Sequence, residues 1–363
     1  MVLQLKTVDK LNITFLVDNT IEWFTKLPPG FTHEAPLHIM KHGHARDPVT
    51  GIPILEFEKY CCGAHGFSAV IETEIEGSEP QLTLFDTGPE SLSIARNIAS
   101  LQIPVERITN LILSHWHSDH SGGILSFLRL RQASSPAPVQ PCVVDVHPSR
   151  PIARGIAPPQ VGRIIGQLAA DPKFEEIEEL GGVVSKHDEG HVVAEGTVYV
   201  SGEIPRVTSW EQGLPGSVRW VEDEGEEGKW VPEEHIMDER YALVDVKGKG
   251  LVIFSACSHA GIVNVVRDAI DKFKRPIHMI IGGLHLATPD LLDRIAPTVD
   301  FLAHKIQPPP TYVLPMHCSG FDVKVALQRE LGEGCLLAGT GIRVKVLGDE
   351  EGEKGIVVPR VEV

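Results

Sequence analysis

The stretch Leu111–Gly123 (LILSHWHSDHSGG) constrains this chain more than any other part of it. An apolar run stops at Ser114, and three histidines and an aspartate follow within six positions: His115, His117, Asp119 and His120. Two glycines come next, and a helical pattern begins at Ile124. In α/β folds, a buried strand that ends in a polar turn and leads into a helix places chemistry at the carboxyl edge of a sheet. We therefore expect the functional site at this turn.

The side chains of this turn are those that bind zinc and related ions, at about 2.0–2.2 Å. Alternate residues of a tight turn point apart, so all four cannot reach one tetrahedral ion. We expect His115 and His117 to share one ion, while Asp119 and His120 face a second. The predicted cofactors are thus two divalent metal ions, zinc first, with manganese or iron as alternatives. A polar loop that is merely rich in histidine is disfavoured, because these ligands directly follow a buried strand.

The second half of the chain repeats this pattern of apolar strands that end in histidine or cysteine. The stretch LVIFSACSH ends in Cys257 and His259, MIIGGLHL ends in His285, and YVLPMHC ends in His317 and Cys318. Core histidines have no reason to lie at strand ends. If parallel neighbouring strands share one carboxyl edge, these groups converge on a single site.

Apolar periodicity predicts the elements around these strand ends. A strand is expected at Gln81–Phe85, and helices are expected at Ser91–Leu101, Ile262–Phe273 and Pro289–His304. The second half echoes the first, with a hairpin followed by alternating helices and strands, which fits two sheets packed face to face with helices outside. The pattern weakens between 148 and 240, where we expect an insertion that shapes a pocket.

Composition restricts the partners of the chain. The formal net charge of −16 argues against a nucleic-acid partner, which would require a basic groove. The N-terminal stretch MVLQLKTVDKLNITF lacks the features of a signal peptide, and no apolar run approaches the roughly 20 residues of a membrane span. The six cysteines are sparse and unevenly spaced, as expected for thiols in a reducing compartment. We expect a cytoplasmic protein that acts on a small molecule, without membrane contact, and a homodimer remains open.

The pattern H-x-H-x-D-H after an apolar strand, followed by Gly-Gly, resembles the metallo-β-lactamase superfamily. The resemblance implies an αββα sandwich with a metal pair at one sheet edge. The expected fold class is therefore α/β (α+β), a four-layer αββα sandwich with a loop-rich insertion. We expect one domain over residues 1–363, with a long loop at 26–60 and the insertion at 148–240 shaping the pocket.

The resemblance also implies roles for three further residues. Cys257, at the end of its strand, fits the position that holds or bridges the second metal, as it does in zinc β-lactamases. His317 fits the late histidine of the family. Asp86, in FDTG, matches the early aspartate that orients ligand histidines without binding metal itself. The alternative for Asp86 is an aspartate that only caps a turn.

One departure from the family concerns the third ligand of the first metal. The family usually has Gly-His between the first motif and the bridging strand, whereas TVYVSGEIPR in this chain has Gly202-Glu203. His259, Glu203 and His147 are the candidates to replace the missing histidine. We favour His259 and place Glu203 below it.

Several short stretches together point to one branch of the superfamily. AHGFSAVIE, GEIPR, CSHAGIVN, GGLHL and the MHCSG–GTG ending resemble the dihydropterin–ribofuranosylaminobenzene 5′-phosphate synthase-like hydrolases. The resemblance covers most of residues 12–345.

The resemblance implies a dinuclear metallohydrolase in which a metal-bound hydroxide attacks an ester or lactone. Asp119 would orient the hydroxide and pass a proton to the leaving group. His65 is a candidate for substrate contact, or else a loop histidine. One alternative is a synthase-like reaction on a pterin and an aminobenzene ribose phosphate, with phosphate donors among the arginines Arg150, Arg154, Arg163 and Arg206. A mononuclear iron persulfide dioxygenase and a non-catalytic metal-retaining protein are the others, although an intact motif argues against the last.

Overall fold

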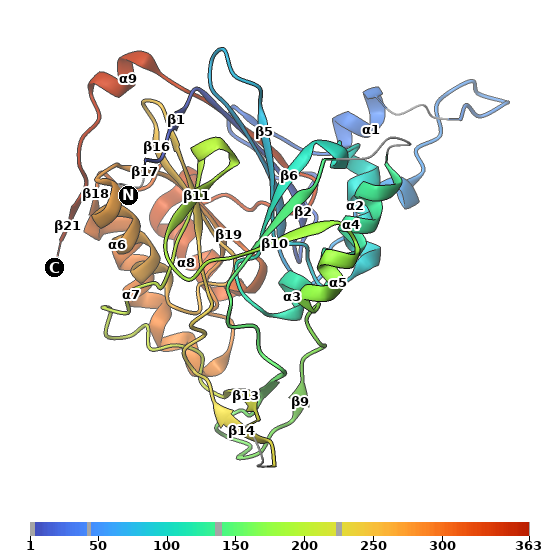
Figure 1. The fold of residues 1–363 in the computed structure, drawn as a ribbon. Coiled ribbons are helices and arrows are strands. Elements are labelled where there is room, and N and C mark those ends of the chain that lie inside the picture. Colours follow the sequence, from blue (N-terminus) through green and yellow to red (C-terminus); the bar gives the residue numbers. More distant parts are fainter. Residues whose placement is uncertain (1–3, 42–44, 135–139, 223–226, 363) are drawn as a thin grey trace.

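The apolar stretches of the sequence form two large β-sheets that pack face to face (Figure 1). The computed structural model describes residues 4–41, 45–134, 140–222 and 227–362. The N-sheet, built mostly from the first half of the chain, runs in the order β10 (Gly182–Lys186), β7 (Cys142–Val146), β6 (Ile108–Ile112), β5 (Gln81–Phe85), β4 (Ser68–Glu74), β2 (Lys10–Val17), β20 (Arg343–Leu347) and β3 (Phe31–Thr32). The C-sheet runs in the order β11 (His191–Val193), β12 (Val198–Val200), β15 (Ala242–Val246), β16 (Gly250–Ser255), β17 (Ile277–Gly283) and β19 (Tyr312–Met316), with β1 (Thr7–Val8) beside β15.

The core between the sheets forms because alternate residues of each strand point inward. In β2, Leu11, Ile13 and Phe15 are fully buried, whereas Asn12 and Thr14 between them are less buried. Aromatic contacts continue from Phe15 to Phe67 and from Phe67 to Phe85, with ring centroids 6.4 and 6.1 Å apart. Phe85 of the N-sheet then meets Phe254 of the C-sheet at 6.0 Å. This row of rings joins the two sheets.

Helices cover the outer face of each sheet (Figure 1). The helices α2 (Ser91–Leu101), α4 (Ile124–Ala133) and α5 (Phe174–Glu179) lie on the N-sheet, and α6 (Ile262–Phe273), α7 (Ile295–Asp300) and α8 (Phe321–Leu331) lie on the C-sheet. The order of layers is helix, sheet, sheet, helix. The predicted α/β sandwich is confirmed.

The single helix predicted for Pro289–His304 is wrong in detail. The chain forms a 3₁₀ turn at Pro289–Arg294, then α7, then a π-type turn at Phe301–Lys305. Pro297 explains the break, because proline lacks the N–H that a continuous helix would need and is tolerated only in a first turn. In α7 it occupies such a position, so the α-helix begins anew just before it.

Residues 148–240 contain two kinds of structure. The strands β10, β11 and β12 belong to the two large sheets. The strands β8 (Arg154–Ile156), β9 (Gly166–Gln167), β13 (Ser217–Val221) and β14 (Lys229–Pro232) form a separate small sheet at the lower end of the molecule in Figure 1. The short helix α3 (Ser118–Ser121), which carries the motif, lies at that same end. The small sheet is therefore placed near the motif.

The long loop at 26–60 contains β3, the short helix α1 (Ala35–Lys41) and a 3₁₀ turn at Phe57–Lys59. The part after α1 projects away from the two sheets at the upper right of Figure 1. The remaining short elements are β18 (Ile306–Gln307), α9 (Glu350–Lys354) and β21 (Arg360–Val361).

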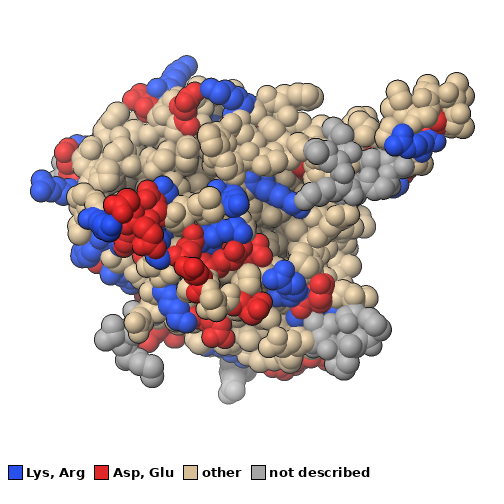
Figure 2. Space-filling model, turned by 90° about the horizontal axis from the view of Figure 1, so that it is seen from above, with Lys and Arg blue, Asp and Glu red and all other residues tan. Residues whose placement is uncertain are grey.

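Charged side chains of both signs share the surface. Figure 2 shows Asp and Glu side chains lying beside Lys and Arg side chains on the face seen from above. The ion pairs of the protein include Lys247 with Glu350 at 2.7 Å and Arg275 with Glu353 at 2.6 Å. Across the described part of the chain, none of the helices has the length and apolar composition that crossing a bilayer requires.

Candidate metal centre

Strand ends from both sheets meet at one edge of the sandwich. In the N-sheet, β5 is parallel to β6, and the chain leaves them at Asp86 and Ser114. In the C-sheet, β16, β17 and β19 are parallel, and they lead to Cys257, His285 and His317. Seven of the predicted residues follow such strands and form two adjacent clusters: His115, His117, Asp119, His120, Cys257, His259 and His317.

The first cluster consists of three buried histidines, His115, His117 and His259. Nε2 of His115 lies 3.0 Å from Nδ1 of His117, and Nε2 of His259 lies 3.2 Å from each of these two atoms. Three nitrogens that coordinate one tetrahedral zinc ion at about 2.0–2.1 Å would lie about 3.3–3.4 Å from one another. The triangle of nitrogens thus has dimensions that fit a shared ion, and His259 supplies its third nitrogen.

The second cluster consists of Asp119, His120, Cys257 and His317, whose candidate ligand atoms all lie within 4.8 Å of one another. The Oδ2 atom of Asp119 is 3.3 Å from Nε2 of His317 and 3.6 Å from Nε2 of His120. The Sγ atom of Cys257 is 3.1 Å from Nε2 of His120. Two nitrogens, one oxygen and one sulfur are a donor set that suits zinc.

Cys257 belongs to both clusters, because its Sγ atom also lies within 4.8 Å of the ligand nitrogens of His115 and His259. The side chain is almost fully buried, and burial raises the pKa of its thiol well above the ordinary value. A thiol in this position becomes a ligand only when a cation replaces its proton. The position between the clusters is the one expected of a bridging residue.

One imidazole of the second cluster, that of His120, differs in charge from the other histidines, since burial also lowers the pKa of His317. Burial lowers the pKa of His115 and His259 well below the ordinary value and that of His117 to about 3, so these rings are neutral and have free lone pairs. Burial alone would also lower the pKa of His120, but the carboxylates of Asp119 and Asp86 outweigh it and raise that pKa to about 9. A cation at the second cluster would therefore displace a proton from His120.

Asp86 orients two of the candidate ligand histidines through hydrogen bonds. Its carboxylate accepts hydrogen bonds from the backbone N–H of Ser114 (2.7 Å), from the Ser114 hydroxyl (2.7 Å) and from Nδ1 of His120 (2.8 Å). The Ser114 oxygen also lies 2.9 Å from Nδ1 of His115. Asp86 thus contacts one ring of the second cluster directly and one ring of the first through Ser114. Such contacts fix the tautomer and orientation of ligand histidines.

The backbone at this edge adopts conformations that side chains other than glycine rarely occupy. Asp86, His285 and His317 have positive φ angles of 56°, 47° and 45°. Non-glycine residues of this kind cluster at functional sites, where the surrounding structure compensates for their strain. Gly122, in the Gly-Gly that follows the motif, is required because a β-carbon there would lie 2.0 Å from the carbonyl oxygen of Pro89.

Asp18 and Asn19, in the loop after β2, contact His317. The sequence analysis did not predict a role for these two residues. The Asp18 carboxylate accepts the backbone N–H of His317 at 2.7 Å. Asn19 places its Oδ1 3.1 Å from Nδ1 of His317 and its Nδ2 3.1 Å from Nδ1 of His65. The available signal was the same as for the motif, namely a pair of polar residues directly after a buried apolar strand.

A buried ionic network behind the motif was also missed. The Asp238 carboxylate accepts the backbone N–H of Trp116 and pairs with Arg154, which also bonds Glu233 at 2.7 Å. The neighbouring Glu239 accepts the backbone N–H groups of His259 and Ala260, each at 2.7 Å. No local pattern in the sequence indicates these contacts, because the acidic residues come from loops far from the motif in the chain.

Four other predicted residues lie outside the two clusters. Glu203 is exposed, and the half-buried His147 accepts the backbone N–H of Ser149. The ring of His285 packs against His259, with centroids 4.6 Å apart, without joining a cluster of ligand atoms in the described residues. His65 lies at the rim with 67% of its side chain exposed, and its Nε2 is 3.6 Å from the Asp119 carboxylate.

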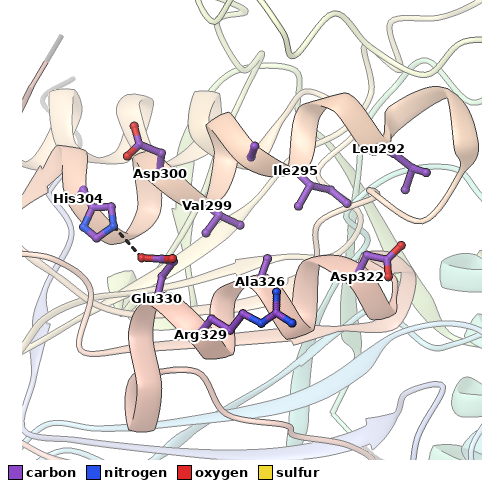
Figure 3. Close-up of a pocket in the computed structure, with 10 residues that line it drawn as sticks. Leu292, Ile295, Val299, Asp300, His304, Asp322, Ala326, Arg329 and Glu330 are labelled. Carbon is purple, nitrogen blue, oxygen red and sulfur yellow. Dashed lines mark hydrogen bonds and ion pairs between the residues drawn. The ribbon is translucent and has the colours of Figure 1, made fainter.

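A large groove lies elsewhere on the molecule. It has a volume of about 610 Å³ and runs between α7 and α8 on the outside of the C-sheet (Figure 3). Its lining includes the ion pair of His304 and Glu330, 3.0 Å apart. None of its lining residues belongs to either histidine cluster, so the groove is not part of the candidate centre.

Comparisons with known proteins agree with this geometry. The family model described as the metallo-beta-lactamase superfamily matches residues 67–207. A curated relative from Methanocaldococcus jannaschii, 7,8-dihydropterin-6-methyl-4-(beta-D-ribofuranosyl)-aminobenzene-5'-phosphate synthase, is 29% identical over 274 residues, which are 74% of this chain and 85% of the relative. An uncharacterised protein of the same organism is 26% identical over 272 residues, covering 73% and 88% of the two chains.

A solved structure supports the fold. A metal-dependent hydrolase of the beta-lactamase superfamily, Tm1679, has a TM-score of 0.60 at 17% identity and covers 93% of this chain and 99% of its own. The resemblance inferred from the motif and from the shorter stretches is confirmed. Residues 67–207 match the model of the metallo-β-lactamase superfamily, and the chain is similar to a dihydropterin–ribofuranosylaminobenzene 5′-phosphate synthase and, in its fold, to a hydrolase of that superfamily.

Proposed function

We propose that this protein is a metal-dependent hydrolase that cleaves an ester or a lactone. One observation carries the proposal: two clusters of ligand atoms share Cys257, and the partly exposed carboxylate of Asp119 lies at their edge. Two divalent ions held there, zinc first, would supply a nucleophilic hydroxide near neutral pH and a Lewis acid for the substrate carbonyl. His115, His117 and His259 would hold the first ion, and Asp119, His120, Cys257 and His317 would hold the second.

The side chains of the rim would handle substrate and protons. Asp119 has 23% of its side chain exposed, so its carboxylate faces both the cluster and the opening. His65, with its Nε2 3.6 Å from that carboxylate, is the imidazole next to it on the solvent side. We assign Asp119 the transfer of a proton to the leaving group and His65 the contact with substrate. An uncharged, partly apolar substrate suits a chain with a net charge of −16, because an anionic one would be repelled.

The test is the hydrolysis of a panel of lactones and aryl esters by the zinc-loaded chain. We expect Asp119→Asn and His117→Ala each to lower kcat/KM by at least about 100-fold, which corresponds to the loss of a group that acts in the transition state. Asp300→Asn, in the groove between α7 and α8, is the matched control and should keep full activity. Zinc content and melting temperature would be measured for each variant. Turnover that survives both substitutions contradicts the proposal.

A second candidate function is the synthase-like reaction, which the similarity to the archaeal synthase favours. It requires donors for a phosphate group. Two of the four arginines considered for this role are engaged in contacts within the protein. Arg154 is buried and paired with Glu233 and Asp238. Arg150 donates to the carbonyl oxygen of Pro172 at 2.8 Å. We therefore place this function second.

Binding and metal analysis separate the candidates. Micromolar binding of an aminobenzene ribose phosphate by the metal-loaded chain, without lactone or ester turnover, would favour the synthase. About two zinc ions per chain would agree with the hydrolase, whereas iron in place of zinc would favour the persulfide dioxygenase.

A further inference from the structure

A third group of metal-ligand side chains lies apart from the candidate centre. It consists of Asp145 in β7, His187 directly after β10 and His191 at the start of β11. We propose that these three residues form an additional binding site for a divalent transition-metal ion such as Zn²⁺. The site shares no residue with the two clusters at the centre.

The two imidazoles converge on one carboxylate oxygen. Oδ2 of Asp145 lies 2.6 Å from Nε2 of His191 and 3.7 Å from Nε2 of His187. The rings are stacked, with centroids 3.8 Å apart and an angle of 22° between their planes. The three candidate ligand atoms lie within 4.8 Å of one another, and Nε2 of His187 also lies 2.8 Å from the Ser185 hydroxyl, which an ion would displace. Two imidazole nitrogens and one carboxylate oxygen are ligands of zinc.

The carboxylate is held in the orientation that the site needs. Its other oxygen, Oδ1, accepts a hydrogen bond from Nη1 of Arg240 at 2.6 Å, and Arg240 also donates to the carbonyl oxygens of Leu113 and Asp145. Oδ2 therefore remains directed at the histidines. Burial alone would raise the pKa of Asp145, but the bond to His191 and the charge of Arg240 outweigh it, and the carboxylate is ionised.

The position of the site sets its expected strength and access. The positive charge of Arg240 weakens the attraction for a cation, so we expect weaker binding here than at the candidate centre. The side chain of His187 is 38% exposed, which leaves the site open for an ion and for a water molecule as an additional ligand. Asp145 belongs to β7 of the N-sheet, His187 directly follows β10 of the same sheet, and His191 belongs to β11 of the C-sheet. A bound ion would therefore cross-link the two sheets at this edge.

The test counts zinc on the full chain after equilibrium dialysis against Zn²⁺ at a series of concentrations. We expect His187→Ala and His191→Ala each to hold about one zinc ion per chain fewer than wild type, whatever number the candidate centre holds. The matched control is His304→Ala, because the exposed His304 is likewise paired with a carboxylate, yet lies in no described group of three ligands. The control should bind as much zinc as wild type.

Thermal unfolding gives an independent reading, because an ion that binds only the folded state raises the melting temperature. Zinc added beyond saturation of the centre should raise the melting temperature of wild type and of His304→Ala, but not that of His187→Ala. If His191→Ala fails to fold, His187→Ala decides alone, since its exposed side chain is replaced without loss of the bond between His191 and Asp145. Equal zinc content in wild type and His187→Ala overturns the proposal, and so does an equal loss in His304→Ala.

Discussion

Asp86 is not a candidate ligand, yet substituting it should weaken metal binding. Its three hydrogen bonds orient His120 directly and His115 through Ser114. We expect Asp86→Ala to weaken zinc binding about 10- to 100-fold, the usual cost of losing a carboxylate that orients a ligand histidine. Competition with a chromophoric zinc chelator would measure the affinity.

The half-buried Asp349, which caps α9, provides the control for Asp86. Asp349→Ala should lose some stability of that short helix and leave the zinc affinity at the wild-type value. Zinc affinity that stays unchanged in Asp86→Ala would show that Asp86 serves only the turn.

At the scale of single residues, the sequence indicated the candidate ligands, but not the residues that hydrogen-bond to them. His115 and Cys257 could be found because core packing gives histidine and cysteine no reason to gather at the ends of apolar strands. Ser114 and Asn19 could not, because serine and asparagine are common in any turn, and only their positions in space connect them to His115 and His317. Glu203 shows the limit of the family pattern, since it occupies the position of a family ligand in the sequence while its side chain is exposed.

The element that shows most clearly how a buried charge affects stability is α6. Its first turn leaves backbone N–H groups unpaired, and the Glu211 carboxylate accepts those of Val263 and Asn264, each at 2.9 Å. Burial raises the pKa of Glu211 from 4.5 to about 7. Because the folded pKa lies above the unfolded one, the stability that this group contributes is complete below pH 4.5 and is lost as the pH rises through 7.

Chemical denaturation of wild type and Glu211→Gln at pH 5 and pH 8 tests this effect. Wild type should lose at most about 3 kcal/mol relative to the variant between these pH values, since each pKa unit corresponds to about 1.4 kcal/mol. Comparison with the variant removes the contribution of Glu239, another buried carboxyl group whose pKa burial raises to about 7. A difference between the two proteins that does not change with pH would contradict the assignment.

Elements were predictable where one local cause dominates. The helices at Ser91–Leu101 and Ile262–Phe273 and the strand at Gln81–Phe85 lie where their periodicity placed them. The sequence pattern does not predict that the strands between 182 and 200 belong to the large sheets. Their pairing with β7 and β15 depends on partners more than 35 residues away in the chain, and no local pattern reports such pairing.

The contact between Phe85 and Phe254 is where the two halves of the molecule depend on each other. Both rings are fully buried, and each belongs to a different sheet. We expect Phe254→Ala to lower the free energy of unfolding by about 3–5 kcal/mol, because it removes apolar contacts and leaves a cavity. Phe321→Ala is the control, since Phe321 is 78% exposed. Urea denaturation should show a lower midpoint for the first variant and a nearly unchanged one for the second.

The candidate centre should also stabilise the whole molecule, because each of its clusters draws ligands from loops of both sheets. His115 and His117 follow the N-sheet strand β6, whereas His259 follows β16 of the C-sheet. An ion shared by them binds only when the sheets are packed together. Free zinc at 100 times the dissociation constant would therefore add about 2.7 kcal/mol to the free energy of unfolding.

Calorimetry with and without a chelator tests this link. The chelator should lower the melting temperature of wild type by several degrees, and it should change that of His117→Ala much less, because this variant has already lost a ligand. His187→Ala, which removes only the additional site, should keep most of the chelator effect. Wild type that melts at the same temperature with and without the chelator would mean that the sheets pack without help from a metal. The convergence of strand ends from both halves would then serve chemistry alone.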